Sequence, residues 1–113
     1  MYEVLSDLNK TTGVTGSMVV GSDGIVIAAD LDTGQDSETV GALAASITSN
    51  ITKSLDRLQT EPLKQVTIEA DNAKLFFADA GLGILVVTTE QEVNVGLIRL
   101  EMKNAISKLS LAH

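Results

Sequence analysis

The sequence has 113 residues, of which 44% are hydrophobic, 20% are charged and only 3% are aromatic, and its formal net charge is -7. This length predicts one domain over residues 1–113, with enough chain to bury a core. Cysteine is absent, which excludes disulfides and thiol chemistry, and the sole histidine is the terminal residue His113, which argues against histidine zinc sites and Ser-His catalysis. An acidic chain with so few aromatic residues is also poorly suited to nucleic acid.

The N-terminal residues 1–7 contain neither a basic start nor an uninterrupted apolar stretch. We therefore expect no signal peptide. The longest apolar run, residues 84–87, is far too short to span a bilayer. These features lead us to expect a cytoplasmic protein.

The first predicted elements are a short helix and a β-hairpin. Residues 2–12 place Val4, Leu5 and Leu8 on one side and predict a short amphipathic helix. The apolar runs 17–20 and 25–29 flank a turn that ends in Asp-Gly, which predicts a β-hairpin. Both runs are apolar at nearly every position, so we expect strands that are covered on both faces.

A long helix is predicted in the middle of the chain. Asp36 or Ser37 can cap its first turn, and Pro62 forbids its continuation. Between them, hydrophobic residues recur at spacings of three and four, which predicts a helix over about residues 37–60. This series comprises Val40, Leu43, Ala44, Ile47, Ile51, Leu55 and Leu58.

The second half of the chain predicts three strands and a helix. Residues 66–69 and 75–78 flank Asp71 and Asn72 and predict a second hairpin, and the continuously hydrophobic residues 84–89 predict a central strand. Asn94 can cap a last helix with a buried stripe from Val95 to Leu109. The order α-β-β-α-β-β-β-α predicts an α+β domain in three layers, with helices on both faces of a mostly antiparallel sheet.

The middle helix has an unusual surface, because no charged residue occurs from Thr39 to Thr52. Its helical period turns Val40, Ala44, Ile47, Ile51 and Leu58 toward the sheet, and a solvated face normally carries Lys, Glu and Arg. We interpret this uncharged surface as a contact with another protein chain. A tolerated neutral surface, or cover by a loop of the same chain, are the alternatives. The residues at issue are a flank with Gly41, Ala45, Thr48 and Thr52, and an outer face with Ala42, Ser46, Ser49 and Lys53.

The strand over residues 66–69 is predicted to lie at a sheet edge, with Val66 and Ile68 on one side and Thr67 and Glu69 on the other. A regular edge strand without proline or a central lysine is prone to pair with another strand. Pairing two copies about a two-fold axis would remove this edge and bring the two middle helices side by side. The alternative is an edge that is simply tolerated. The predicted dimer interface comprises Gly41, Ala45, Thr48, Thr52, Val66, Thr67, Ile68 and Glu69, and the predicted partner-binding surface comprises Ala42, Ser46, Ser49 and Lys53.

No catalytic, cofactor or metal site is predicted. The glycine-containing turns 21–24 and 81–83 are not followed by the Gly-Lys-Ser/Thr of a phosphate loop. Asp30, Asp32 and Asp36 lack the glycine and the distal glutamate of a calcium loop, and no serine or threonine has a visible base. We therefore expect a protein that is not an enzyme.

Three segments together resemble the Roadblock (dynein light chain) family: residues 16–28, the small-residue helix that begins at Val40, and residues 94–102. The resemblance implies a profilin-like fold, in which a five-stranded antiparallel sheet has the middle helix on one face and the two terminal helices on the other. It also implies a homodimer through the third strands and the middle helices. Prokaryotic relatives of the MglB type bind and regulate a Ras-like GTPase through the helix surface and supply no arginine finger, and this middle helix has no arginine before Arg57.

The resulting hypothesis is a non-catalytic homodimer, without cofactors, that binds a Ras-like small GTPase and modulates its nucleotide cycle. Two other functions stay open. One is a structural adaptor subunit that ignores the nucleotide. The other is a small-molecule sensor with a pocket between sheet and helix.

Overall fold

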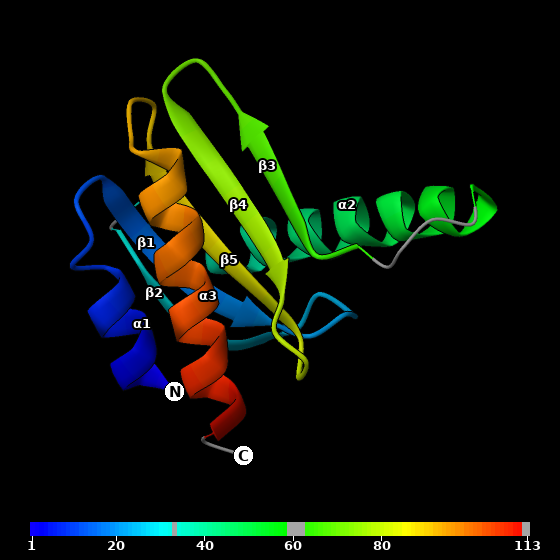
Figure 1. Ribbon diagram of the computed structural model, residues 1–113, viewed down its shortest axis with the longest axis horizontal. Helices are drawn as coiled ribbons and strands as arrows, with labels where there is room; N and C mark the ends of the chain where they lie inside the picture. Colours follow the sequence, from blue (N-terminus) through cyan, green and yellow to red (C-terminus); the bar gives the residue numbers. More distant parts are fainter. Residues whose placement is uncertain (33, 59–62, 112–113) are drawn as a thin grey trace.

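The computed structural model describes residues 1–32, 34–58 and 63–111. Three helices and five strands follow one another in the predicted order (Figure 1). They are α1 (Tyr2–Leu8), β1 (Val14–Val20), β2 (Val26–Leu31), α2 (Ser37–Arg57), β3 (Gln65–Glu69), β4 (Ala73–Asp79), β5 (Ile84–Glu90) and α3 (Val95–Leu111).

The five strands form one sheet in the order β2-β1-β5-β4-β3, and every neighbouring pair is antiparallel. Strand β5 lies in the middle, and its residues 84–89 are all buried, which confirms the predicted central strand. Strand β3 lies at one edge, also as predicted. Strand β2 forms the other edge.

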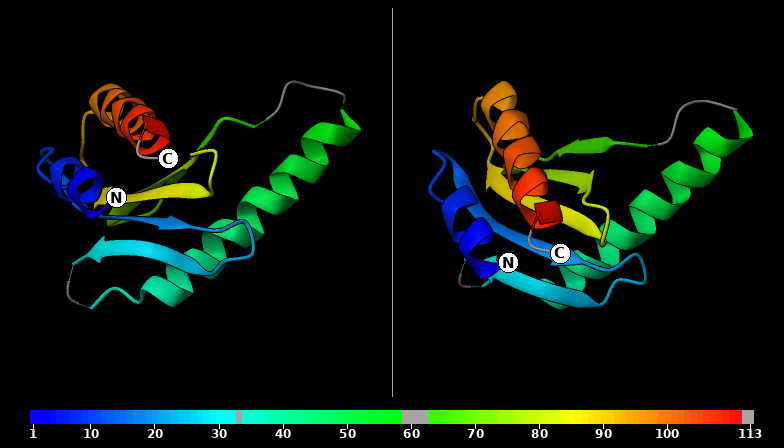
Figure 2. Two further views of the ribbon diagram at one scale, coloured as in Figure 1. Left: turned by 90° about the horizontal axis from the view of Figure 1, so that it is seen from below. Right: turned by 60° about the horizontal axis from the view of Figure 1, so that its bottom comes forward.

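The sheet separates two hydrophobic cores. Figure 2 shows α1 and α3 together on one face and α2 alone on the other. Leu5 of α1 and Ile98 of α3 pack with the sheet residue Phe76 in the first core, whereas Ala44 of α2 packs with Met18 and Phe77 in the second. The predicted three-layer α+β architecture, with one helix on one face and two on the other, is confirmed.

Polar side chains begin the two long helices at the predicted positions. The Asp36 carboxylate accepts hydrogen bonds from the Thr39 hydroxyl (2.8 Å) and the Glu38 backbone N–H (3.1 Å). These bonds favour the charged form and lower the pKa of Asp36 from its usual value. Asn94 caps α3, since its Oδ1 accepts from the Leu97 N–H at 3.0 Å.

Several boundaries differ from the predictions. Helix α1 ends at Leu8, short of residue 12, and β2 continues to Leu31. The expectation that residues 25–29 are covered on both faces was wrong: Ile25 lies in the turn before β2 and is 68% exposed, and Ile27 of the edge strand β2 is 44% exposed. Helix α2 ends at Arg57, and the predicted residues 59 and 60 lie outside the described residues.

Candidate functional site

Helix α2 is longer than the sheet on which it packs. Its first half lies against the sheet near β1, where Gly41 approaches Val20 so closely that a β-carbon on the glycine would lie 2.9 Å from Val20 Cγ1. Its second half continues past β3 and leaves the sheet (Figures 1 and 2). The side chain of Leu58 is therefore 70% exposed, and the prediction that it faces the sheet was wrong because the helix has passed the sheet edge there.

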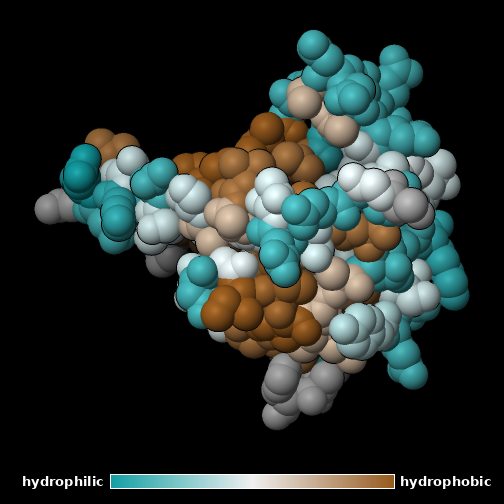
Figure 3. All heavy atoms as spheres, turned by 180° about the vertical axis from the view of Figure 1, so that it is seen from behind, coloured by the Kyte–Doolittle hydropathy of each residue, from teal (hydrophilic) through white to brown (hydrophobic). Residues whose placement is uncertain are grey.

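Because α2 leaves the sheet in this way, part of the sheet has no helix above it. On the α2 face, Met18 of β1 and Val86 of β5 are fully buried, whereas Val66, Ile68 and Leu75 of β3 and β4 are only partly buried. Hydrophobic residues gather beside α2 over these two strands (Figure 3). An apolar sheet face that continues beyond its covering helix is a surface to which another chain can be added.

The two edges of the sheet differ in their capacity to pair with another strand. Strand β3 pairs with β4 in an unbroken register, so its outer edge is regular. Strand β2 contains a register shift opposite Val19 and Val20, and the Asn9 side-chain amide donates to the backbone oxygen of Asp30 at 2.8 Å. Bulges and occupied backbone groups discourage strand addition, so β3 is the edge better suited to it.

Two residues of the predicted dimer interface are already packed within the chain. Gly41 is buried against Val20 and the carbonyl of Gly24, and Ala45 is only 9% exposed beside the same β1–β2 turn. Their small size allows the close approach of this turn to α2. A contact with a second chain stays a prediction for these two residues and for the other six, which are Thr48, Thr52, Val66, Thr67, Ile68 and Glu69.

Thr48 and Thr52 line a groove of about 540 Å³ between α2, the start of β3 and the β4–β5 turn. Its lining combines apolar side chains such as Phe77 with the cations Lys53 and Lys64, neither of which has a carboxylate within 4 Å among the described residues. The Thr48 Oγ1 atom is buried and has no hydrogen-bond partner in the described part of the chain. The groove is thus an apolar hollow with unpaired polar groups at its wall.

The predicted partner-binding residues lie together on the outer face of α2. Ala42, Ser46, Ser49 and Lys53 are all exposed, and Ser49 and Lys53 also border the groove. The sequence reasoning did not assign Leu43 to this exposed surface, although its side chain is 45% exposed. Its place in the hydrophobic series concealed it, because Leu43 lies at the margin of the stripe that Val40, Ala44 and Ile47 turn toward the sheet.

The described residues contain no group of three or more His, Cys, Asp or Glu side chains arranged to hold a metal ion. No helix in the described ranges is long and apolar enough to cross a membrane. Fold and surface together define a small α+β domain with a regular open sheet edge and, beside it, a helix that has no charged residue from Thr39 to Thr52. That description fits a domain made for association with other chains.

Comparison with known proteins identifies the family. The family model of the Roadblock/LC7 domain matches residues 1–89. The uncharacterized proteins MJ0310 and MJ0714 of Methanocaldococcus jannaschii are each 46% identical over 106 residues, which cover 94% of this chain and 93% and 90% of theirs. The chain belongs to the Roadblock/LC7 family.

Solved structures share the fold at lower identity. A Roadblock/LC7 domain from Streptomyces avermitilis superposes with a TM-score of 0.91 at 22% identity, covering 99% of this chain and 96% of its own. Myxococcus xanthus MglB superposes with a TM-score of 0.90 at 20% identity, covering 97% and 91%. A further MglB structure, described as having a tetrameric arrangement, gives 0.85 at 20% identity, covering 96% and 83%. These similarities confirm the expected architecture.

Proposed function

We propose that the protein is a non-catalytic homodimer that binds a Ras-like small GTPase and modulates its nucleotide cycle. The observation that carries the proposal is the combination of a helix that has no charged residue from Thr39 to Thr52 and overhangs the sheet at its end with an apolar sheet face that is only partly buried over β3 and β4. Membership of the Roadblock/LC7 family and the likeness to MglB support it.

The dimer follows from what each copy leaves uncovered. If two β3 strands pair antiparallel about a two-fold axis, the overhanging half of each α2 lies above the β3–β4 region of the other copy. Val66, Ile68 and Leu75 would then be covered by a helix, and Leu58 would gain a surface to pack on. Sedimentation of the purified chain tests this step, and a single copy at high concentration would refute it.

The paired helices would present a surface to the GTPase. The outer residues Ala42, Ser46, Ser49 and Lys53 of both copies would form one two-fold patch that carries small side chains and few charges. Such a surface regulates the GTPase through a difference in affinity. If the dimer binds one conformation of the switch regions more tightly than the other, it shifts the GTPase toward that conformation. No residue of this chain needs to enter the nucleotide site.

A matched pair of variants tests the proposal. Ser46→Arg puts a long charged side chain on the exposed face of α2, and Ser107→Arg makes the same change on the exposed face of α3. With the small GTPase of the same organism, loaded with GDP or with a GTP analogue, Ser46→Arg should weaken binding at least about 10-fold and Ser107→Arg should not. Equal binding of the wild-type chain to both nucleotide states would refute nucleotide-dependent regulation.

The groove favours one other function, that of a small-molecule sensor. Its volume of about 540 Å³ lies within the range of small-molecule pockets, and the free Thr48 hydroxyl could bind a polar ligand group. A metabolite that raises the melting temperature of the wild-type chain, but not of Thr48→Val, would support this function. An adaptor role would show itself differently, as co-purification of a larger complex in which no GTPase is present.

A further inference from the structure

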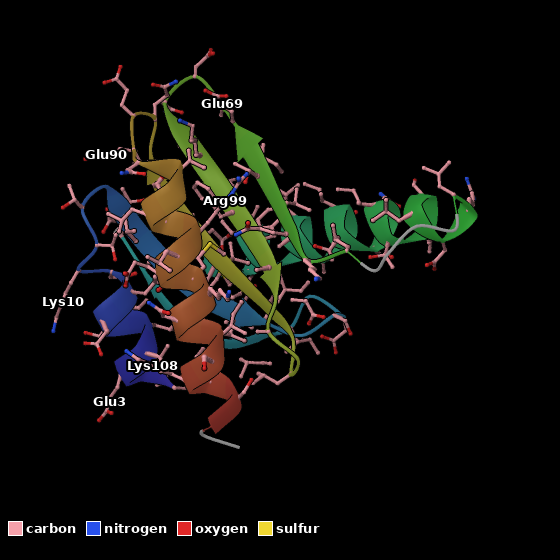
Figure 4. All side chains as sticks on the ribbon, in the orientation of Figure 1. Glu3, Lys10, Glu69, Glu90, Arg99 and Lys108 are labelled. Atoms are coloured by element: carbon pink, nitrogen blue, oxygen red, sulfur yellow. The ribbon has the colours of Figure 1, made fainter. Side chains whose placement is uncertain are left out.

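The β3 edge has a polar face on the side opposite α2. Arg99 of α3 reaches over this edge, and its Nη2 donates to Thr67 Oγ1 at 3.3 Å (Figure 4). Among the described residues no carboxylate lies within ion-pair distance of Arg99. The guanidinium thus lies at the open edge of the sheet without an anionic partner.

Glu69 lies two residues farther along the same strand and on the same face as Thr67. Its side chain is 65% exposed, and its nearest cation, Lys74 Nζ, is 3.9 Å away. Lys74 is itself held by the backbone oxygen of Gln91 at 2.8 Å. Glu69 therefore has room for a second cation at the outer side of β3.

The hydrogen-bond pattern of the β3–β4 hairpin shows which backbone groups point outward. The Ala70 N–H donates to the Ala73 oxygen, and the Asp79 N–H donates to the Lys64 oxygen. Because the bonded residues alternate along an antiparallel strand, residues 66 and 68 also bond to β4. The backbone groups of Gln65, Thr67 and Glu69 are then the ones directed at the open edge.

This alternation restricts how a second copy can pair. A two-fold antiparallel pairing that uses all five residues of both β3 strands must be centred on Thr67. Thr67 then lies opposite Thr67 of the second copy, and Gln65 lies opposite Glu69 of the second copy. Glu69 of the second copy is then a diagonal neighbour of Thr67. Diagonal neighbours lie about 7–8 Å apart, within reach of long side chains.

We propose that Arg99 and Glu69 form a self-complementary charge cluster across this seam, which selects a second copy of the same chain as partner. The inference rests on the homodimer of the proposed function. At the axis, two guanidinium groups and two carboxylates meet on one face of the continuous sheet. The Arg99 guanidinium of each copy then lies near the Glu69 carboxylate of the other. A chain without this arrangement would bring like charges together or leave one charge unpaired.

Charge reversal followed by mixing tests the cluster. Arg99→Glu alone replaces both guanidinium groups by carboxylates, although Lys74 stays beside Glu69, and Glu69→Arg alone replaces both carboxylates by guanidinium groups, so each variant should form homodimers at least about 10-fold more weakly than the wild type. Mixed together, the two variants should form the heterodimer at least about 10-fold more tightly than either homodimer, as measured by native mass spectrometry with one variant mass-tagged. The preference should shrink as salt is raised.

A control pair separates local contact from overall charge. Lys108→Glu and Glu90→Arg make the same changes in net charge at exposed positions away from β3, and their mixture should show no such preference. If Glu69→Arg does not fold, the salt dependence of dimerisation decides, since the conservative variant Arg99→Gln should reduce it relative to the wild type.

The outcomes separate the two proposals. A wild-type dimer whose charge-reversed variants mix at random, or whose salt dependence Arg99→Gln leaves unchanged, overturns the role of the cluster and leaves the dimer intact. A wild-type chain that stays single, or pairs only with a different Roadblock chain, overturns both the cluster and the homodimer.

Discussion

Leu58 offers a direct measure of how much the overhanging end of α2 gains from a second chain. Its side chain is 70% exposed in the single chain. Full burial of a leucine contributes about 1.5–3 kcal/mol, so the exposed fraction leaves about 1–2 kcal/mol to be gained in each copy. A two-fold dimer contains this residue twice. Leu58→Ser should therefore weaken dimerisation by about 2–4 kcal/mol, which raises the Kd about 30- to 700-fold.

The assay is sedimentation equilibrium over a range of concentrations, with Leu100→Ser as the matched control. Leu100 on α3 is 54% exposed and lies on the opposite face of the sheet, so its replacement should leave the Kd unchanged. Circular dichroism should give the same spectrum for both variants and the wild type. A Kd for Leu58→Ser within about 2-fold of the wild type would mean that no second chain covers this end of the helix in the dimer.

Three further predictions concern stability. Gly41→Ala should lower the unfolding free energy by about 1 kcal/mol, because crowding against Val20 exceeds the gain in helix propensity. Gly96→Ala should raise it in the same urea titration, because its β-carbon would meet Asn94 Oδ1 only at an ordinary contact distance of 3.5 Å. Gly83→Ala should cost at least about 2 kcal/mol in thermal melts, since its β-carbon would overlap the backbone oxygen of Val20. The lowered pKa of Asp36 means that its carboxylate stabilises the fold above the usual value of 3.8 and that this contribution is lost as the pH falls through the lowered pKa. Urea midpoints from pH 7 to pH 2 should therefore show wild type and Asp36→Asn converging in acid.

Each of these predictions has a clear contrary result. A Gly41→Ala variant as stabilised as Gly96→Ala would show that the β1–β2 turn does not press on α2. An unchanged melting temperature for Gly83→Ala would contradict the close approach of the β4–β5 turn to β1. A difference between Asp36→Asn and the wild type that stays constant down to pH 2 would show that the charge at the start of α2 contributes nothing.

Local chemistry made most of the fold predictable. Asp36 and Asn94 supply oxygen atoms to free N–H groups at helix starts, and this contact requires only neighbouring residues. The same holds for the hairpin turn at Asp71 and Asn72, where Ala70 bonds to Ala73. The uninterrupted hydrophobic run over residues 84–87 indicated a central strand because only a strand buried on both faces tolerates it.

The candidate site was less predictable, because it depends on where elements lie relative to one another. The helical period assigned Leu58 to the sheet-facing stripe of the helix, but it contains no information on where the sheet ends. Gly41 and Ala45 have small side chains and pack against the β1–β2 turn of the same chain. This contact arises only when the turn folds onto α2. Arg99 lay off the buried stripe of its helix, and its proximity to Thr67 arises from the packing of α3 over β3.

In the proposed homodimer, the length of α2 beyond its sheet would link the lifetime of the protein in the cell to its abundance. Turns that find no cover on their own molecule open easily and are exposed to proteases. In a pairing chain, mass action protects them only when copies are plentiful, so melting temperature should rise with protein concentration. Molecules made at a low rate of synthesis would then be short-lived. The steady-state level of the protein would rise more than proportionally with its rate of synthesis.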